Sequence, residues 1–247
     1  MKYLFFQTCS PLLVSYEILA LSFSKTIRKY DENKVNGNSC LSNYNTTFTL
    51  LILNASILEG VLRSILIWKI KNEVENTIKE RQSLGYDSPS KAENLLYKFR
   101  EEVEHQGGWE SLKNQYSLFL DISLESVMNK SYENTKEAIN VLFTLRNILA
   151  HGTTIIQPKD KMPDDMKNVY PYKWQSKTQQ ASVYLNKQFN KGENILDNLS
   201  SDAVPEHFMN ITKQFITKLK DEIEIPKESK EIIDMIEKYT FGYRWFS

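Results

Sequence analysis

The stretch NTKEAINVLFTLRNILAHG, residues 134–152, constrains the fold more than any other part of the chain. Asn134 can cap the first turn of a helix, and Glu137 follows it at the spacing of a capping box. Gly152 suits the left-handed position that ends a helix. Between these ends, apolar residues recur at helical spacing and form one stripe, made of Ala138, Val141, Leu142, Leu145, Ile148 and Leu149. We therefore predict a helix that ends near Gly152 and buries this stripe.

Three polar side chains lie off the apolar stripe, near the end of the same helix. Asn147 and His151 are one turn apart and roughly opposite the centre of the stripe, and Arg146 lies on its flank. Phe143 and Ala150 are their neighbours, so this back face is itself partly apolar. The pattern predicts that the back of the helix meets something other than bulk water.

The segment RNILAHG, residues 146–152, resembles the ribonuclease motif of the HEPN superfamily (higher eukaryote and prokaryote nucleotide-binding domains). In that motif a polar residue directly follows an Arg, and a His stands five positions beyond the Arg. The resemblance implies an all-α helical bundle and a metal-independent RNA endonuclease with Arg146, Asn147 and His151 as catalytic residues. It also implies a homodimer that brings two motifs into one cleft. Similar proteins often act as toxins or phage-defence effectors, sometimes with an antitoxin or another defence-system partner.

The residue types fit that chemistry. Cleavage of RNA without a metal requires attack by a 2′-hydroxyl, charge stabilisation at the phosphate, and proton transfer. His titrates near neutrality, and Arg stays charged and can donate two parallel hydrogen bonds to a phosphate. Asn147 could orient a phosphate oxygen or His151. Two other interpretations remain: a non-catalytic module that binds a nucleotide or a partner protein, and a purely helical scaffold.

A second strong helical pattern runs from Thr46 to about Gln82. Glu59 and Arg63 follow one another at one-turn spacing on its side. Glu59 could reach the Arg146 guanidinium and hold it in place. Alternatively, Glu59 and Arg63 form an ordinary surface ion pair, which is common and weak. After Lys69 the helix becomes charged and should project into water.

Gly and Pro are scarce, which favours helices over a turn-rich β fold. The 247 residues, 41% of them hydrophobic, suffice for one sizeable core. We predict one all-α domain, 1–247, with a helical insertion at about 83–132 and a C-terminal helical extension at about 203–247. Asp31–Asn45 should be a loop, and further helices are predicted over Pro11–Tyr30, Ser90–Gln106, Trp109–Met128, Pro205–Ile223 and Lys227–Tyr239.

The charges limit the kind of partner. Lys+Arg and Asp+Glu are both 31, so RNA contact should be confined to a small site rather than spread over a basic surface. The two cysteines and three histidines are scattered without metal-ligand spacing, so we expect no metal or other cofactor. No apolar run reaches about eighteen residues, so no membrane span is expected. The cytoplasm is the simplest location.

The segment after the motif changes character. Thr153–Gln157 and Ala181–Leu185 have β-branched or alternating residues, which predicts a small β-hairpin. Lys173, Trp174 and Tyr184, together with neighbouring tyrosines and lysines, could form a rim on which RNA bases stack. The same aromatic residues could instead pack a long loop onto the core. His105 and His207 are expected to have no catalytic role.

Overall fold

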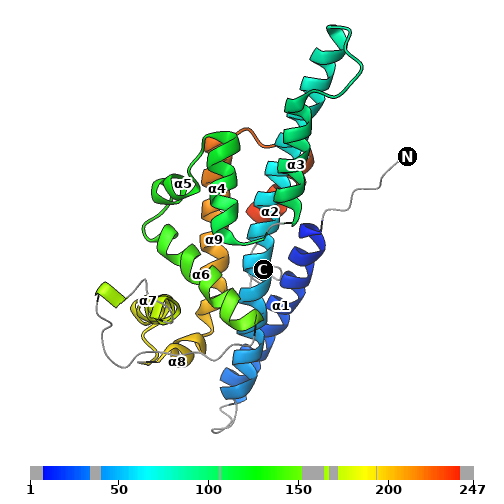
Figure 1. Ribbon diagram of the computed structural model, residues 1–247. Helices are drawn as coiled ribbons and strands as arrows, with labels where there is room; N and C mark the ends of the chain where they lie inside the picture. Colours follow the sequence, from blue (N-terminus) through cyan, green and yellow to red (C-terminus); the bar gives the residue numbers. More distant parts are fainter. Residues whose placement is uncertain are drawn as a thin grey trace.

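The computed structural model describes residues 8–33, 40–105, 107–151, 164–166, 172–192 and 194–239. Within these ranges the chain forms ten α-helices, one short 3-10 helix and no strand (Figure 1). The predicted all-α class is therefore confirmed for the described residues. The helices are α1 (Cys9–Asn33), α2 (Cys40–Ser83), α3 (Lys91–His105), α4 (Trp109–Leu120), α5 (Leu124–Lys130), α6 (Thr135–Ala150), α7 (Tyr172–Phe189), α8 (Ile195–Leu199), α9 (Ala203–Glu222) and α10 (Lys227–Lys238).

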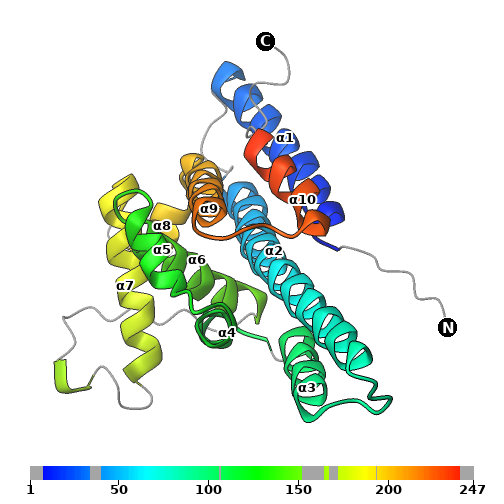
Figure 2. The same ribbon diagram turned by 90° about the horizontal axis from the view of Figure 1, so that it is seen from above.

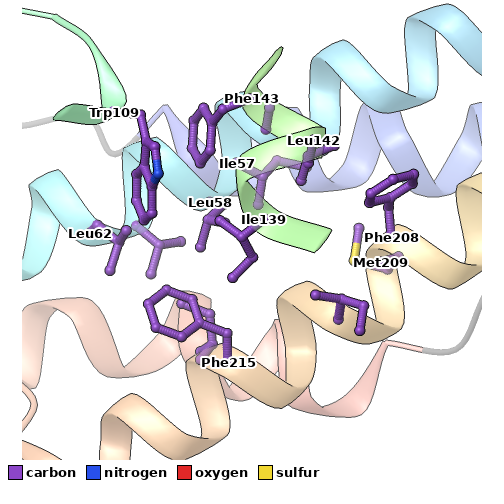
Figure 3. Packing of buried hydrophobic residues seen from close by; sticks show 14 of the residues in the cluster. Ile57, Leu58, Leu62, Trp109, Ile139, Leu142, Phe143, Phe208, Met209 and Phe215 are labelled. Atoms are coloured by element: carbon purple, nitrogen blue, oxygen red, sulfur yellow. The ribbon is translucent and has the colours of Figure 1, made fainter. Parts of the chain in front are cut away.

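Helix α2 is the centre of the fold. Figure 2 shows it crossing the middle of the molecule, with α1 and α10 on one side and α4 and α6 on the other. Its middle is apolar on nearly every side, so it can be covered only by several other helices. Figure 3 shows α6 and α9 packing onto it through large apolar side chains. Side chains of α2 with no exposed surface are Leu50, Leu51, Ala55, Ile57, Leu58, Val61, Leu62, Ile65, Leu66 and Ile70.

The predicted insertion, residues 83–132, contributes to the same core. Tyr116 of α4 is fully buried, and its hydroxyl donates a hydrogen bond of 2.7 Å to the Leu62 carbonyl of α2. The single helix predicted over Trp109–Met128 is in fact two, α4 and α5. Asp121 separates them with a φ of 54°, in the left-handed region that ends a helix.

One strand of the predicted hairpin is wrong. Ala181–Leu185 lies within α7, and the other strand, Thr153–Gln157, is outside the described residues. A strand would alternate buried and exposed side chains, but here the adjacent residues Ala181 and Ser182 are both buried, and so are Tyr184 and Leu185. Buried positions one and three residues apart fit a helix face instead.

The helix α2 passes a length and composition test for a membrane span. Within Thr46–Ser83 the most apolar 18-residue window has a mean hydropathy of 1.8 and is 56% buried. The sequence has no unbroken apolar run of about eighteen residues, but the polar residues within this window, such as Asn54 and Glu59, do not lower its mean hydropathy below that of a span. A buried core helix passes the same test, and α2 holds that position in this fold.

The end of α2 and helix α3 form an arm that projects beyond the other helices (Figure 1). A capping box starts α3: Ser90 Oγ accepts the Glu93 N–H at 3.1 Å, and Glu93 Oε1 accepts the Ser90 N–H at 3.4 Å. The same carboxylate accepts a 2.7 Å hydrogen bond from Arg81 Nε of α2. Glu93 is 1% exposed, so these donors compensate a buried charge.

Glu93 should therefore contribute more to the free energy of unfolding than Ser90, its partner in the capping box. Ser90→Ala removes one cap bond and should lower the free energy of unfolding by about 0.5–2 kcal/mol. Glu93→Ala also leaves Arg81 without its carboxylate and should cost more. Urea unfolding of the two variants provides the comparison. Equal losses in the two variants would show that the Arg81 contact contributes nothing.

His207, in the first turn of α9, joins α9 to α7. Its Nε2 lies 2.7 Å from the Tyr184 hydroxyl, and its ring contacts Phe189 and Phe208. This burial lowers the pKa of His207 below its ordinary value. His207 thus has a structural role in the packing of α7.

The lowered pKa predicts acid sensitivity. The unfolded chain binds a proton at His207 more readily than the folded chain does. The contribution of His207 to the free energy of unfolding is therefore fully present above about pH 6.5 and decreases as the pH falls below that value. His207→Gln should have a lower free energy of unfolding than the wild type at pH 7.5. On acidification to pH 5.5, however, its free energy of unfolding should fall by less than that of the wild type. Urea unfolding at both pH values measures this, and parallel losses in both proteins would exclude His207 as the cause.

Candidate functional site

The last turn of α6 presents the motif residues. The apolar stripe of α6 packs into the core as predicted: Ala138, Val141, Leu142, Leu145 and Ile148 are buried, and Leu149 is partly buried. At the other end Asn134 has a φ of 67° and its side chain makes no capping bond, so that predicted cap is wrong. The predicted closing residue, Gly152, lies outside the described residues.

Glu59 of α2 is the hydrogen-bond acceptor that the other residues of the site share. Its Oε2 accepts a 2.7 Å hydrogen bond from Arg146 Nη2, 87 residues further along the chain. Its Oε1 accepts hydrogen bonds from Arg63 Nη2 at 2.9 Å and Nε at 3.2 Å, and from the Gly108 N–H at 3.4 Å. Glu59 thus does both things proposed for it, since it pairs with Arg63 and also holds Arg146.

The network is not an ordinary surface pair. The side chains of Glu59 and Arg63 are each 14% exposed and that of Arg146 is 22% exposed. Arg63 also donates to the Val103 carbonyl at the end of α3. Two guanidinium groups thus share the Glu59 carboxylate in partly buried surroundings. A guanidinium is suited to bind an anion such as a phosphate.

Aromatic rings fix the other side of the Arg146 guanidinium. Its Cζ lies 5.5 Å from the centre of the Phe143 ring, and that ring stacks on Trp109 at 4.5 Å with an interplanar angle of 8° (Figure 3). The Trp109 indole N–H donates to Asn140 Oδ1 at 3.0 Å. Among the described residues Glu59 is the one hydrogen-bond partner of Arg146, and its buried Nε has no acceptor.

The stacking of Phe143 agrees with the prediction that the back of α6 does not face bulk water. Phe143 is 2% exposed because Trp109 of the same chain covers it, so it is not available to a second chain. The back of α6 is therefore covered there by α4 and not by a partner. Ala150, at the end of the helix, remains exposed.

Asn147 and His151 lie on the open end of the same helix. Asn147 is partly buried and His151 is exposed, and the His151 N–H donates to the Asn147 carbonyl at 3.4 Å. Within the described part of the chain, no hydrogen bond joins either side chain to the Glu59 network. The structure thus brings Arg146 together with Glu59 and Arg63, and leaves His151 one turn away facing solvent.

The structure contradicts one member of the predicted RNA-binding rim. Tyr184 is 1% exposed and packs against His207 and Phe208, which contradicts its predicted role as a stacking ring and agrees with the packing alternative. The side chains of Lys173 and Trp174 lie outside the described residues.

Two members of the site had no sequence signal for their role. Gly108 directs its N–H at Glu59, and its φ of 118° is a conformation that other residues rarely adopt. Trp109 supports the Phe143 ring. A Gly107-Gly108 pair is typical of a helix boundary, but nothing in its spacing connects it with Glu59.

No family model matches this chain, and neither a curated protein nor a solved structure with significant similarity to it was found. In the part of the chain that the structure describes, no three His, Cys, Asp or Glu side chains gather as metal ligands would.

The contact between Glu59 and Arg146 predicts energetic coupling. Glu59→Ala, Arg146→Ala and the double variant form a double-mutant cycle, in which contacting partners of a shared network typically give about 0.5–3 kcal/mol. Urea unfolding measures each free energy. A control cycle that combines Glu59→Ala with a change at Lys177, an exposed residue of α7, should give a coupling energy of zero. A zero value for the Glu59–Arg146 cycle would show that the pair contributes nothing to stability.

Proposed function

We propose that this protein is a metal-independent RNA endonuclease of HEPN type, in which Arg146, Asn147 and His151 act on the scissile phosphate. The observation that supports the proposal most directly is the Arg146 guanidinium, held by Glu59 beside a second guanidinium and still partly exposed. Glu59 accepts one hydrogen bond from Arg146, through Nη2, so other N–H groups of the guanidinium are left to donate to a phosphate.

The chemistry needs no group beyond the RNA and these side chains. The RNA 2′-oxygen attacks the adjacent phosphorus, and the bond from phosphorus to the 5′-oxygen breaks. The products are a 2′,3′-cyclic phosphate and a 5′-hydroxyl end. Arg146 stabilises the developing charge, and Asn147 orients a phosphate oxygen or His151. His151 transfers a proton, for which its exposed position at the end of α6 is accessible.

Two copies of the chain supply the complete set of groups. The reaction removes a proton from the 2′-hydroxyl and delivers one to the leaving oxygen, and one imidazole does not do both at the same moment. A homodimer in which each chain contributes its motif provides an acid and a base. We propose a toxin or phage-defence setting in the cytoplasm, with tRNA, mRNA or rRNA as substrate and with an antitoxin or other defence protein as a further partner.

The direct test is cleavage of total RNA in the presence of EDTA. The wild-type protein should produce fragments with 2′,3′-cyclic phosphate ends, and His151→Ala and Arg146→Ala should each lower the rate by about a hundredfold or more. Lys230→Ala, at an exposed position of α10, is the surface control and should cleave normally. RNA that stays equally intact with every protein would overturn the proposal.

A non-catalytic module that binds a phosphate-bearing ligand is the second candidate. The observation that favours it is the lack of any hydrogen bond, within the described residues, between His151 and the Glu59 network. Such a module would bind RNA or a nucleotide through Arg146 without cleavage, and His151→Ala would leave the affinity unchanged. Filter binding beside the cleavage assay separates the two functions.

A further inference from the structure

A pocket of about 440 Å³ lies at the base of the arm, where the end of α3 meets the first residues of α1 and α10 (Figure 1). One face of α2, from Gly60 to Lys71, forms its floor, and the other three helices close its sides. Small-molecule sites in proteins typically have volumes of about 300–1,000 Å³. The pocket is therefore large enough for a small organic ligand.

Part of the pocket wall is apolar. Ile67 and Trp68 of α2 line it, and so does Cys9 of α1, which is 3% exposed. Burial raises the pKa of the Cys9 thiol to about 11, so this group is neutral near pH 7. A Cβ at Gly60 would lie 2.6 Å from Cys9 Sγ, so the glycine allows α1 to approach α2 and close this side. A ligand that fills the pocket therefore needs an apolar body.

Two cations from different helices also line the pocket. The side chains of Arg100 on α3 and Lys71 on α2 are 24% and 28% exposed. Arg100 pairs with Glu104 through Nε and Nη2, each 3.0 Å from the same carboxylate oxygen, and this pair leaves Nη1 for another acceptor. Lys71 Nζ lies 3.9 Å from Glu75 Oε1, at the limit of an ion pair, and 4.2 Å from the centre of the Trp68 ring. Both side chains are suited to take a further acidic partner.

Arg63, a third cation of the wall, directs its donors away from the pocket. Its Nε and Nη2 donate to Glu59, and its Nη1 donates to the Val103 carbonyl. An acidic group in the pocket would therefore meet Arg100 and Lys71 and leave the Glu59 network intact.

The acidic side chains of the pocket are more exposed than Arg100 and Lys71. The side chain of Glu104 is 35% exposed and is already paired with Arg100. Glu228 is exposed and lies in the first turn of α10, where the helix dipole stabilises its charge. Water and salt screen exposed charges more than partly buried ones. The pocket should thus prefer a ligand with an acidic group over one with a basic group.

We infer that this pocket binds a small organic anion, whose acidic group contacts Arg100 and Lys71 and whose apolar body lies against Ile67 and Trp68. A carboxylate and a phosphate can both accept hydrogen bonds from these two cations. The pocket contains none of the three motif residues, so this ligand site is additional to the proposed function and does not require it.

Isothermal titration calorimetry of the full chain with two probes of the same shape tests the site. 2-Naphthoate has an apolar body and a carboxylate, whereas 2-naphthamide has the same body without the charge. The wild type should bind 2-naphthoate about tenfold or more tightly than 2-naphthamide, since a hydrogen bond to a charged group contributes more than one to a neutral group. Acetate lacks the apolar body and should show no binding. 2-Naphthyl phosphate, titrated in parallel, distinguishes a phosphate from a carboxylate as the preferred acidic group.

Four variants locate the probe. Arg100→Gln and Lys71→Gln each remove one proposed contact and should weaken the binding of 2-naphthoate about tenfold. Lys98→Gln and Lys79→Gln are the matched controls, because they remove the same charge from exposed positions of α3 and α2 that do not line the pocket. Both controls should bind 2-naphthoate like the wild type.

A wild-type chain that does not bind 2-naphthoate at millimolar concentration would overturn the inference, as would equal affinities for 2-naphthoate and 2-naphthamide. Unchanged binding in both pocket variants would also overturn it. Loss of binding in Arg146→Ala but not in Arg100→Gln would assign the anion to the candidate site instead. Circular dichroism shows whether each variant is folded, and contacts on two helices keep the test decisive if one variant is not. RNA cleavage is not measured, so a failure here leaves the proposed function unaffected.

Discussion

The burial of α2 is the constraint on which the rest of the structure depends. A helix that is apolar on nearly every side between Leu50 and Ile70 gains stability only if other helices cover it all round. Each fully buried leucine or isoleucine contributes about 1.5–3 kcal/mol, so the ten fully buried apolar residues of α2 outweigh any local preference in their neighbours. The positions of α1, α3, α6, α9 and α10 follow from this requirement.

The candidate site is a consequence of the same burial. Glu59 and Arg63 lie on α2 within its largely buried middle, and their side chains are each 14% exposed, so their charges are partly desolvated. A partly buried carboxylate needs strong donors, and Arg63, Arg146 and the Gly108 N–H supply them. The Arg146 guanidinium of α6 thus binds a residue of the central helix and not one of a loop, and this contact fixes its position.

Periodicity predicted the long helices but not where polar segments end. The stripes of α2, α6 and α9 are regular because one face of each is buried. Asp31–Asn45 was wrongly predicted to be entirely a loop, since α1 continues to Asn33 and α2 begins at Cys40. Helices that already pack in a core can extend through residues of modest propensity. The break at Asp121 had no signal, because neither Gly nor Pro marks it.

For the site, the sequence identified Arg146, Asn147 and His151 by motif and raised Glu59 as a neighbour. It could not decide whether Glu59 touches Arg146, because a contact between residues 87 positions apart depends on how two helices cross. The roles of Gly108 and Trp109 depend on the turn before α4 and were not predictable either. Tyr184 was misjudged as a stacking ring because that prediction rested on its closeness to the motif in sequence, whereas Ala181, Tyr184 and Leu185 lie on one buried helix face.

The arm formed by α2 and α3 has a practical consequence. Its tip, SLGYDSPS at 83–90, lies at the far end of the projection, where Leu84 and Tyr86 are each 66% exposed and no core packing is at stake. Exposed turns of this kind tolerate inserted sequence. A fluorophore or an epitope placed there would mark the molecule at a point far from α6, and would leave both the motif and the central helix in their native surroundings.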